Sequence, residues 1–113
     1  MGQRRKFILY HRTTPEEARA VLSRGFRDSS GTHEGRTTWR GVWLSASPAA
    51  AAEHAPGEAV IEVRVAVSER ELGKWEWTGE GRVVREWLIP AGVLNPRMTA
   101  RLLEQKALSE AVA

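Results

Sequence analysis

Apolar and polar residues alternate most clearly along residues 59–67 (AVIEVRVAV), and this pattern predicts a β-strand. Every second residue from Ile61 to Val67 is Ile or Val, whereas Glu62 and Arg64 lie between them. Successive side chains of a strand point to opposite faces of a sheet. We therefore expect one face of this strand to be buried and the other to be wet.

Three shorter apolar runs predict further strands, over residues 6–10 (KFILY), 41–45 (GVWLS) and 82–89 (RVVREWLI). Pro90 ends the last of these runs, because proline cannot donate a backbone hydrogen bond to a ladder. Glu80-Gly81 predicts a turn just before the same run.

The segment that follows the first strand carries a consistent set of helix signals. Thr14 is a suitable N-cap, Pro15 fits the first helical position, and Glu17 can complete a capping box with Thr14. Gly25 is placed to end the helix in a left-handed conformation. The apolar face of this helix is predicted to carry Ala18, Val21 and Leu22.

The remaining segments give weaker patterns. Ser47-Pro48 predicts the start of a short Ala-rich helix that runs to about residue 55, and residues 68–72 predict one helical turn. Asn95-Pro96 leads into a predicted last helix over residues 98–108. Residues 27–40 have no clear period and two Gly, so we expect a long loop, either a lid over a site or a surface connection.

These elements predict one α+β domain that spans residues 1–113. Strands and helices are mixed but do not alternate as βαβ units throughout, which disfavours a doubly wound sheet. No internal repeat or linker divides the chain. The P-loop and GxGxxG patterns are absent, so neither a Walker nor a Rossmann nucleotide site is indicated.

Charge and composition narrow the function classes only slightly. The net charge of +3 permits a nucleic-acid partner or a phosphate-bearing ligand, but the basic residues are scattered along the chain. The absence of Cys excludes disulfides and thiolate chemistry, and the three His have no HExxH spacing, so we expect no metal. The chain lacks a long apolar run and a secretion signal, so we expect a cytoplasmic protein with no membrane partner.

Three residues stand out at predicted strand positions: His11, Trp43 and Glu86. Glu86 shares one face of its strand with apolar residues, so its carboxylate must be paired, hydrogen-bonded, near the strand end or functional. Each residue also has a structural interpretation. A His near a strand end commonly holds a hydrogen bond, a Trp commonly fills a core, and Glu86 can pair with Arg85 or another Arg.

The contexts of these residues resemble the motifs of the diphtheria-toxin-like and poly(ADP-ribose)-polymerase-like ADP-ribosyltransferases. "LYHRTT" (residues 9–14) resembles their first motif, an apolar strand that ends in His. "GVWLSASPAAAAEHA" (residues 41–55) resembles the second, in which an aromatic residue on a strand precedes a helix with a second aromatic. "VVREWLIP" (residues 83–90) resembles the third, a strand with Glu before an aromatic. The order matches the His-Tyr-Glu arrangement and covers most of the chain.

This resemblance implies a small split β-sheet with a few flanking helices, and NAD as substrate. It implies that His11 bonds a hydroxyl of the adenosine ribose, that the backbone of Arg12 meets the nicotinamide amide, and that Thr13 stands where the family often has Ser or Thr. Trp43 would stack on the nicotinamide ring. His54 would supply the second aromatic of that pocket.

Glu86 would hold the nicotinamide ribose and stabilise the positive charge that develops when the glycosidic bond breaks. With His11 it makes the catalytic pair that the resemblance implies. The countercharge for the pyrophosphate would come from Arg12, Arg36 or Arg40.

The sequence also departs from the family pattern. Arg12 stands where the family usually has Gly, Trp43 replaces Tyr, and Ala51 stands where it often has Ser. Ser45 or Ser47 would then supply the missing hydroxyl. The related branch with a Ser-Thr-Ser strand and the tRNA 2′-phosphotransferases fit this sequence less well.

Three hypotheses follow from the sequence. The first is a mono-ADP-ribosyltransferase that releases nicotinamide and modifies a protein or nucleic acid, as some bacterial toxins do. The second is a non-catalytic module of the same fold that binds NAD or nucleic acid. The third is a small nucleic-acid-binding protein without nucleotide chemistry.

Overall fold

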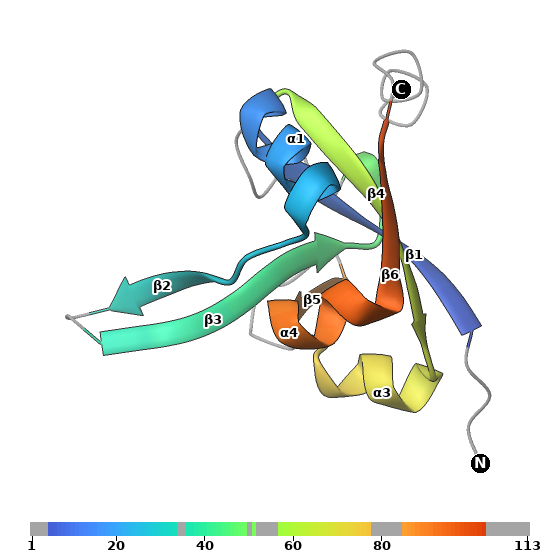
Figure 1. The fold of residues 1–113 in the computed structure, drawn as a ribbon. Helices are drawn as coiled ribbons and strands as arrows, with labels where there is room; N and C mark the ends of the chain where they lie inside the picture. The colour runs from blue at the N-terminus through green and yellow to red at the C-terminus, as the bar shows by residue number, and fades with distance from the viewer. Residues whose placement is uncertain (1–4, 34–35, 50, 52–56, 78–84, 104–113) are drawn as a thin grey trace.

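The computed structural model describes residues 5–33, 36–49, 51, 57–77 and 85–103 (Figure 1). They form a mixed α+β domain with one antiparallel sheet and a few helices. The strands are β1 (Arg5–Thr13), β2 (Ser29–His33), β3 (Arg36–Ser45), β4 (Ala59–Val67), β5 (Glu86–Ile89) and β6 (Met98–Leu102). The helices are α1 (Pro15–Arg24), α3 (Glu69–Lys74), α4 (Ala91–Leu94) and the 3-10 turn η1 (Asn95–Arg97).

The sheet has the strand order β2-β3-β1-β4-β6, and β5 pairs with β3 outside this path. β1 and β4 pair along their whole length, from Arg5↔Val67 to Thr13↔Ala59. By contrast, β3 pairs with β1 only at Tyr10↔Ser45. The two parts of the sheet are therefore joined by a single ladder pair between their adjacent strands.

β3 has different neighbours along its length. Its first half pairs with β2, from Ser29↔Gly41 to His33↔Arg36, and this hairpin projects from the body of the domain (Figure 1). Its second half pairs with β5, from Val42↔Ile89 to Ser45↔Glu86. The long strand β3 thus belongs both to the projecting hairpin and to the sheet that covers the core.

The predicted strand over residues 59–67 is confirmed with the same bounds. Ile61, Val63, Val65 and Val67 are all almost fully buried in the hydrophobic core, as the alternation requires. The opposite face is wet only in part, because Glu62 is also buried.

Two arginines compensate the buried carboxylate of Glu62. Arg101 of β6 donates from Nε to Oε1 at 2.9 Å and from Nη2 to Oε2 at 3.1 Å. Arg64 donates from Nε to Oε1 at 3.3 Å. These bonds, that of Arg101 above all, lower the pKa of the Glu62 carboxyl although burial opposes the shift. The negative charge of Glu62 is therefore stabilised beside the sheet by hydrogen bonds from these two arginines.

The predicted first helix is confirmed as α1. The Thr14 hydroxyl accepts a hydrogen bond from the backbone N–H of Glu17 at 3.2 Å, and Gly25 ends the helix with φ of 88°. Ala18 and Val21 are buried as predicted. Leu22 is not: 43% of it is exposed, so the buried stripe of this short helix is narrower than the spacing suggested.

The predicted loop over residues 27–40 is wrong, because most of this segment forms β2 and the first half of β3. This hairpin projects from the body, and its sequence is rich in Ser, Thr and Gly and carries no apolar alternation. Gly31 lies directly across from Trp39, and a Cβ at position 31 would collide with the indole Nε1 of Trp39. Because Gly31 has no side chain, the indole of Trp39 can lie over this position of β2.

The predicted last helix is also wrong at its start, because residues 98–102 form strand β6. β6 pairs with the outer edge of β4, from Val65↔Met98 to Ile61↔Leu102, and Met98 and Ala100 pack against the core. Tertiary pairing along β4 overrides the helical propensity of this segment. Residues 104–108 of the predicted helix lie outside the described residues.

Other predicted elements are confirmed in part. The turn predicted at 68–72 is α3, capped by Ser68. The strand predicted over 6–10 is extended at both ends in β1, and the one over 82–89 is described only as β5, since 78–84 lie outside the described residues. Of the helix predicted after Ser47, residues 48, 49 and 51 are helical and 50 and 52–56 are not described. No helix among the described residues has the length and apolar character to cross a membrane.

The side chain of Asn95, the first residue of η1, is hydrogen-bonded to the backbone of Phe26, just after the end of α1. Its Oδ1 accepts a hydrogen bond from the backbone N–H of Phe26 at 2.8 Å, and its Nδ2 donates to the Phe26 carbonyl at 2.9 Å. Phe26 is 5% exposed, so water can replace these bonds only poorly. The Asn95 side chain therefore fixes the backbone of a buried aromatic residue.

We expect Asn95→Ala to lower the free energy of unfolding by about 1–3 kcal/mol, because it leaves buried backbone groups of Phe26 without partners. Urea denaturation measures this change. Asn95→Asp retains the Oδ1 acceptor and should fall between the wild type and Asn95→Ala. Arg70→Ala, at an exposed position on α3, is the control. A wild-type midpoint for Asn95→Ala would contradict the assigned role of this side chain.

Candidate functional site

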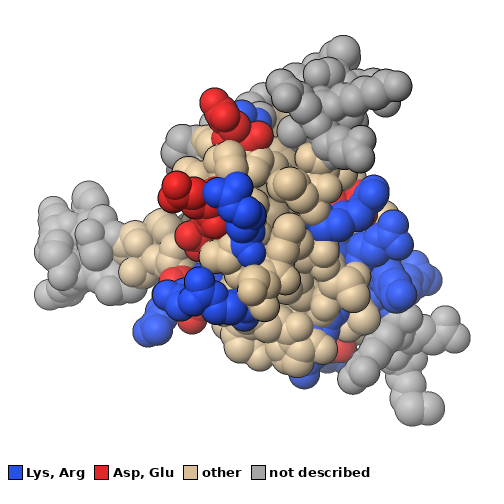
Figure 2. All heavy atoms as spheres, turned by 45° about the horizontal axis from the view of Figure 1, so that its top comes forward, with Lys and Arg blue, Asp and Glu red and all other residues tan. Residues whose placement is uncertain are grey.

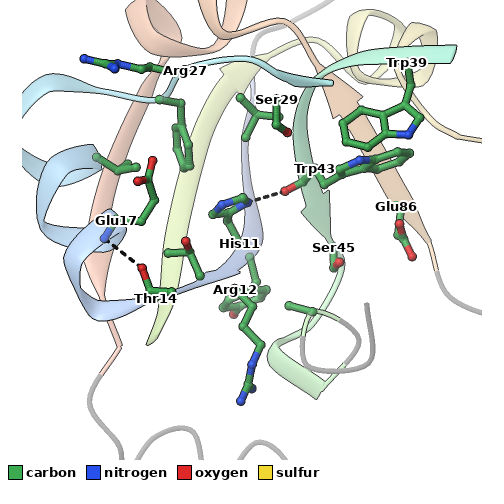
Figure 3. Close-up of a pocket in the computed structure, with 16 residues that line it drawn as sticks. His11, Arg12, Thr14, Glu17, Arg27, Ser29, Trp39, Trp43, Ser45 and Glu86 are labelled. Carbon is green, nitrogen blue, oxygen red and sulfur yellow. Dashed lines mark hydrogen bonds between the residues drawn. The ribbon is translucent and has the colours of Figure 1, made fainter. Parts of the chain in front are cut away.

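A cavity of about 650 Å³ opens where β1 leaves β3, beside the first turn of α1 (Figure 3). Its lining combines aromatic side chains with hydroxyl, imidazole, carboxylate and guanidinium groups. The lining residues used below are His11, Arg12, Thr13, Glu17, Phe26, Arg27, Trp39, Trp43, Ser45, Ala51 and Glu86. The cavity is large enough for a small-molecule ligand or cofactor.

His11 lies at the point where the two parts of the sheet separate. It follows Tyr10, whose pairing with Ser45 is the ladder contact between β1 and β3. The His11 Nδ1 lies 2.7 Å from the backbone carbonyl oxygen of Trp43. Because a carbonyl oxygen can only accept, Nδ1 carries the proton and donates. In the neutral ring, Nε2 is then an acceptor.

The environment of His11 favours this neutral ring. Burial lowers the pKa of the imidazole, and it outweighs the hydrogen bond to the Trp43 carbonyl and the negative charge of Glu17, which both raise it. Phe26 packs edge-to-face against the ring, with centroids 5.1 Å apart and planes at 83°. At neutral pH the cavity therefore contains an oriented, uncharged imidazole.

Trp43 belongs to a group of three indoles. Its ring centroid is 5.4 Å from that of Trp39 and 5.3 Å from that of Trp77, and both pairs are edge-to-face. Such packing restrains the ring plane of Trp43, and the residue is half-buried. An oriented aromatic ring thus forms part of the cavity wall.

Glu86 is the first residue of β5 and is only 3% exposed. It pairs with Ser45, and Leu88 pairs with Trp43. Side chains directly across an antiparallel ladder lie on the same face, so Trp43, Ser45 and Glu86 share the cavity side of this strand pair. The opposite face carries Leu44 and other buried apolar residues, which explains how an acid can alternate with core residues.

Arg85, one of the alternative partners considered for Glu86, is paired with Glu76 instead. Arg85 donates two hydrogen bonds to Glu76, from Nε at 3.0 Å and from Nη2 at 2.9 Å. Its guanidinium also lies 5.0 Å from the ring centroid of Trp87. Adjacent strand residues point to opposite faces, so Arg85 and Glu86 are directed apart.

The structure brings most of the sequence-predicted site residues together. His11, Arg12, Thr13, Trp43, Ser45 and Glu86 all line the cavity. His54 lies outside the described residues. Arg40 is not among the lining residues; it forms an ion pair with Asp28 at 3.5 Å. No three His, Cys, Asp or Glu side chains gather as metal ligands within the described part of the chain.

Glu17, Phe26 and Trp39 are among the lining residues that the sequence did not assign to a site. The sequence assigns Glu17 only to the cap of the first helix. Trp39 lies in the segment predicted as a loop, but it stands four residues before Trp43 and therefore on the same face of β3. A strand predicted to begin before Gly41 would include it.

Comparisons with family models, with curated proteins and with solved structures gave no match for this chain.

The His11 ring should titrate with a pKa below 6.5, because burial disfavours the imidazolium. The stability that this group contributes is therefore fully present above pH 6.5 and is lost as pH falls through the lower, folded-state pKa. NMR titration of the ring Cε1–H resonance measures this value, with His11→Gln to assign the signal. A midpoint at or above 6.5 would show that the ring is not held neutral.

Proposed function

We propose that this chain is an NAD-dependent mono-ADP-ribosyltransferase-like domain, which transfers ADP-ribose to a protein or nucleic-acid acceptor and releases nicotinamide. One observation carries the proposal: His11, Trp43 and Glu86, far apart in the sequence, line one cavity. They come from β1, β3 and β5, in the order that the resemblance to the His-Tyr-Glu transferases requires. The junction of β1 and β3 at one ladder pair is consistent with the split sheet of that family.

The chemistry of the cavity suits the nicotinamide half of NAD. The nicotinamide ring of NAD is flat and cationic, and an indole face attracts such a ring. Trp43 presents a half-exposed indole, and Glu86 lies on the same face of the same strand pair. A ring held on Trp43 therefore places the attached ribose near a buried carboxylate.

The proposed reaction breaks the bond between nicotinamide N1 and ribose C1′. The bonding electron pair leaves with nicotinamide, which becomes neutral, and positive charge develops on the ribose. The buried Glu86 carboxylate stabilises this charge. A lone pair of the acceptor then forms the new bond to C1′, and the acceptor releases a proton.

His11 would act in binding rather than in proton transfer. Its Nδ1 proton is committed to the Trp43 carbonyl at 2.7 Å, and the neutral Nε2 accepts. A ribose hydroxyl is the donor that this nitrogen would bind in NAD. The hydrogen bond from His11 Nδ1 also fixes the position of the Trp43 backbone. It therefore links the two halves of the proposed dinucleotide site.

The alternative is a module of the same fold that binds NAD or nucleic acid without turnover. Ala51 favours it, because this residue is buried and lines the cavity where the family often has a Ser hydroxyl. Arg12 also lines the cavity where the family usually has Gly. Ser45, also in the lining, is the hydroxyl that would replace the missing one.

The distribution of charge gives less support to nucleic-acid binding alone. On the face drawn in Figure 2, Lys and Arg side chains lie in separate groups, with acidic and neutral surface between them. Several arginines are paired: Arg85 with Glu76, and Arg64 and Arg101 with Glu62. A continuous basic surface of the kind that binds phosphate backbones is not seen on this face.

Glu86→Gln should reduce the rate of nicotinamide release at least about 100-fold, since it keeps the side-chain shape but removes the charge. The NAD dissociation constant should change little, because the carboxylate acts mainly on charge that develops in the transition state. Chromatography of released nicotinamide and calorimetric titration with NAD measure the two quantities.

Glu76→Gln is the matched control, because Glu76 is an acid close to β5 in space that does not line the cavity. Nicotinamide release that is equal in the wild type and in Glu86→Gln would overturn the catalytic role of Glu86. NAD binding without any release by the wild type would favour the non-catalytic module. An absence of NAD binding would overturn the proposal as a whole.

A further inference from the structure

The first turn of α1 presents two acids, and only one of them faces the cavity. Glu16 and Glu17 are adjacent and both exposed, but Glu17 alone lines the cavity. Neighbouring residues of a helix point about 100° apart, which separates the two carboxylates. The Thr14 cap holds the backbone N–H of Glu17 at 3.2 Å and so fixes this turn against the end of β1.

Glu17 and Glu86 lie at opposite sides of the cavity, with His11 between them (Figure 3). Glu17 and His11 line the same cavity, and the negative charge of Glu17 raises the pKa of the His11 ring. In the proposed function the nicotinamide half of the ligand lies at Trp43 and Glu86, so the adenosine half would extend toward Glu17.

Two of the groups that line this side of the cavity, His11 and Glu17, are hydrogen-bond acceptors. The Nε2 of neutral His11 accepts, because Nδ1 donates to the Trp43 carbonyl. The Glu17 carboxylate also accepts, and it is anionic. Arg27 lines the same cavity, but Figure 3 shows its guanidinium directed away from His11 and Glu17. Two neighbouring acceptors suit a ligand group with two O–H donors and oppose a phosphate, which is anionic and accepts only.

We propose that Glu17 and His11 together bind the vicinal hydroxyls of the adenosine ribose, and that Glu17 makes the site select NAD over NADP. In NADP the 2′-hydroxyl carries a phosphate, which loses one donor and brings negative charge against the carboxylate. This inference rests on the proposed function, because it assumes that the cavity takes a nicotinamide dinucleotide. It assigns a specificity-determining role to a residue that the sequence motifs did not include.

Calorimetric titration of the full chain with NAD and with NADP tests the inference without a turnover assay. We expect the wild type to bind NAD at least about tenfold more tightly than NADP, a difference of about 1.4 kcal/mol, since the Glu17 carboxylate repels a 2′-phosphate. Glu17→Gln should bring the two dissociation constants within about threefold of each other, and Glu17→Arg should favour NADP. Glu16→Gln, one residue away in the same turn, should keep the wild-type ratio.

The outcomes separate the two proposals. Equal affinity of the wild type for NAD and NADP would overturn the role of Glu17 and leave the proposed function standing. A ratio that changes as much in Glu16→Gln as in Glu17→Gln would also overturn it, because the effect would then be one of general charge. Binding of neither dinucleotide by the wild type would overturn the proposed function and this inference together.

Discussion

The site depends on the hydrogen bond from His11 Nδ1 to the Trp43 carbonyl, at 2.7 Å. It forms immediately beyond Tyr10↔Ser45, where the pairing of β1 with β3 ends. One bond therefore does three things. It engages the Trp43 backbone carbonyl just beyond the last β1–β3 ladder pair, it sets the tautomer of the imidazole, and it fixes the strand that carries Trp43.

The register of β5 on β3 is the second constraint on the site. Glu86 faces the cavity because it pairs with Ser45, while Trp87 pairs with Leu44 in the core. A shift of one residue would turn the carboxylate into the core and the indole of Trp87 into the cavity. Burial of Leu44, Trp87 and Ile89 opposes such a shift. The packing that stabilises the sheet therefore also directs the Glu86 carboxylate to the cavity.

The parts of the fold that can be predicted from the sequence are those in which local signals agree with tertiary packing. The cap at Thr14, the stop at Gly25 and the alternation along 59–67 each correspond to an observed boundary or buried face. The residues His11, Trp43 and Glu86 line one cavity.

The wrong secondary-structure predictions at 27–40 and 98–102 have a common physical reason, because each segment becomes a strand through its partner rather than through its own pattern. β2 and the start of β3 pair with each other in a local hairpin outside the body, and β6 pairs with the edge of β4, which is distant in sequence. Pairing with a partner strand does not require an apolar alternation within the segment itself.

The single Tyr10↔Ser45 pair has a mechanical consequence. Between β1 and β3 it is the only ladder contact among the described residues, so it can serve as a hinge between the half-sheet of β1, β4 and β6 and the half-sheet of β3 and β5. A small rotation there would widen or narrow the opening while the long β1–β4 ladder stays intact. The size of molecule that this opening admits is then set less by the backbone ladder than by how firmly the hydrogen bond from His11 to the Trp43 carbonyl keeps the two halves together.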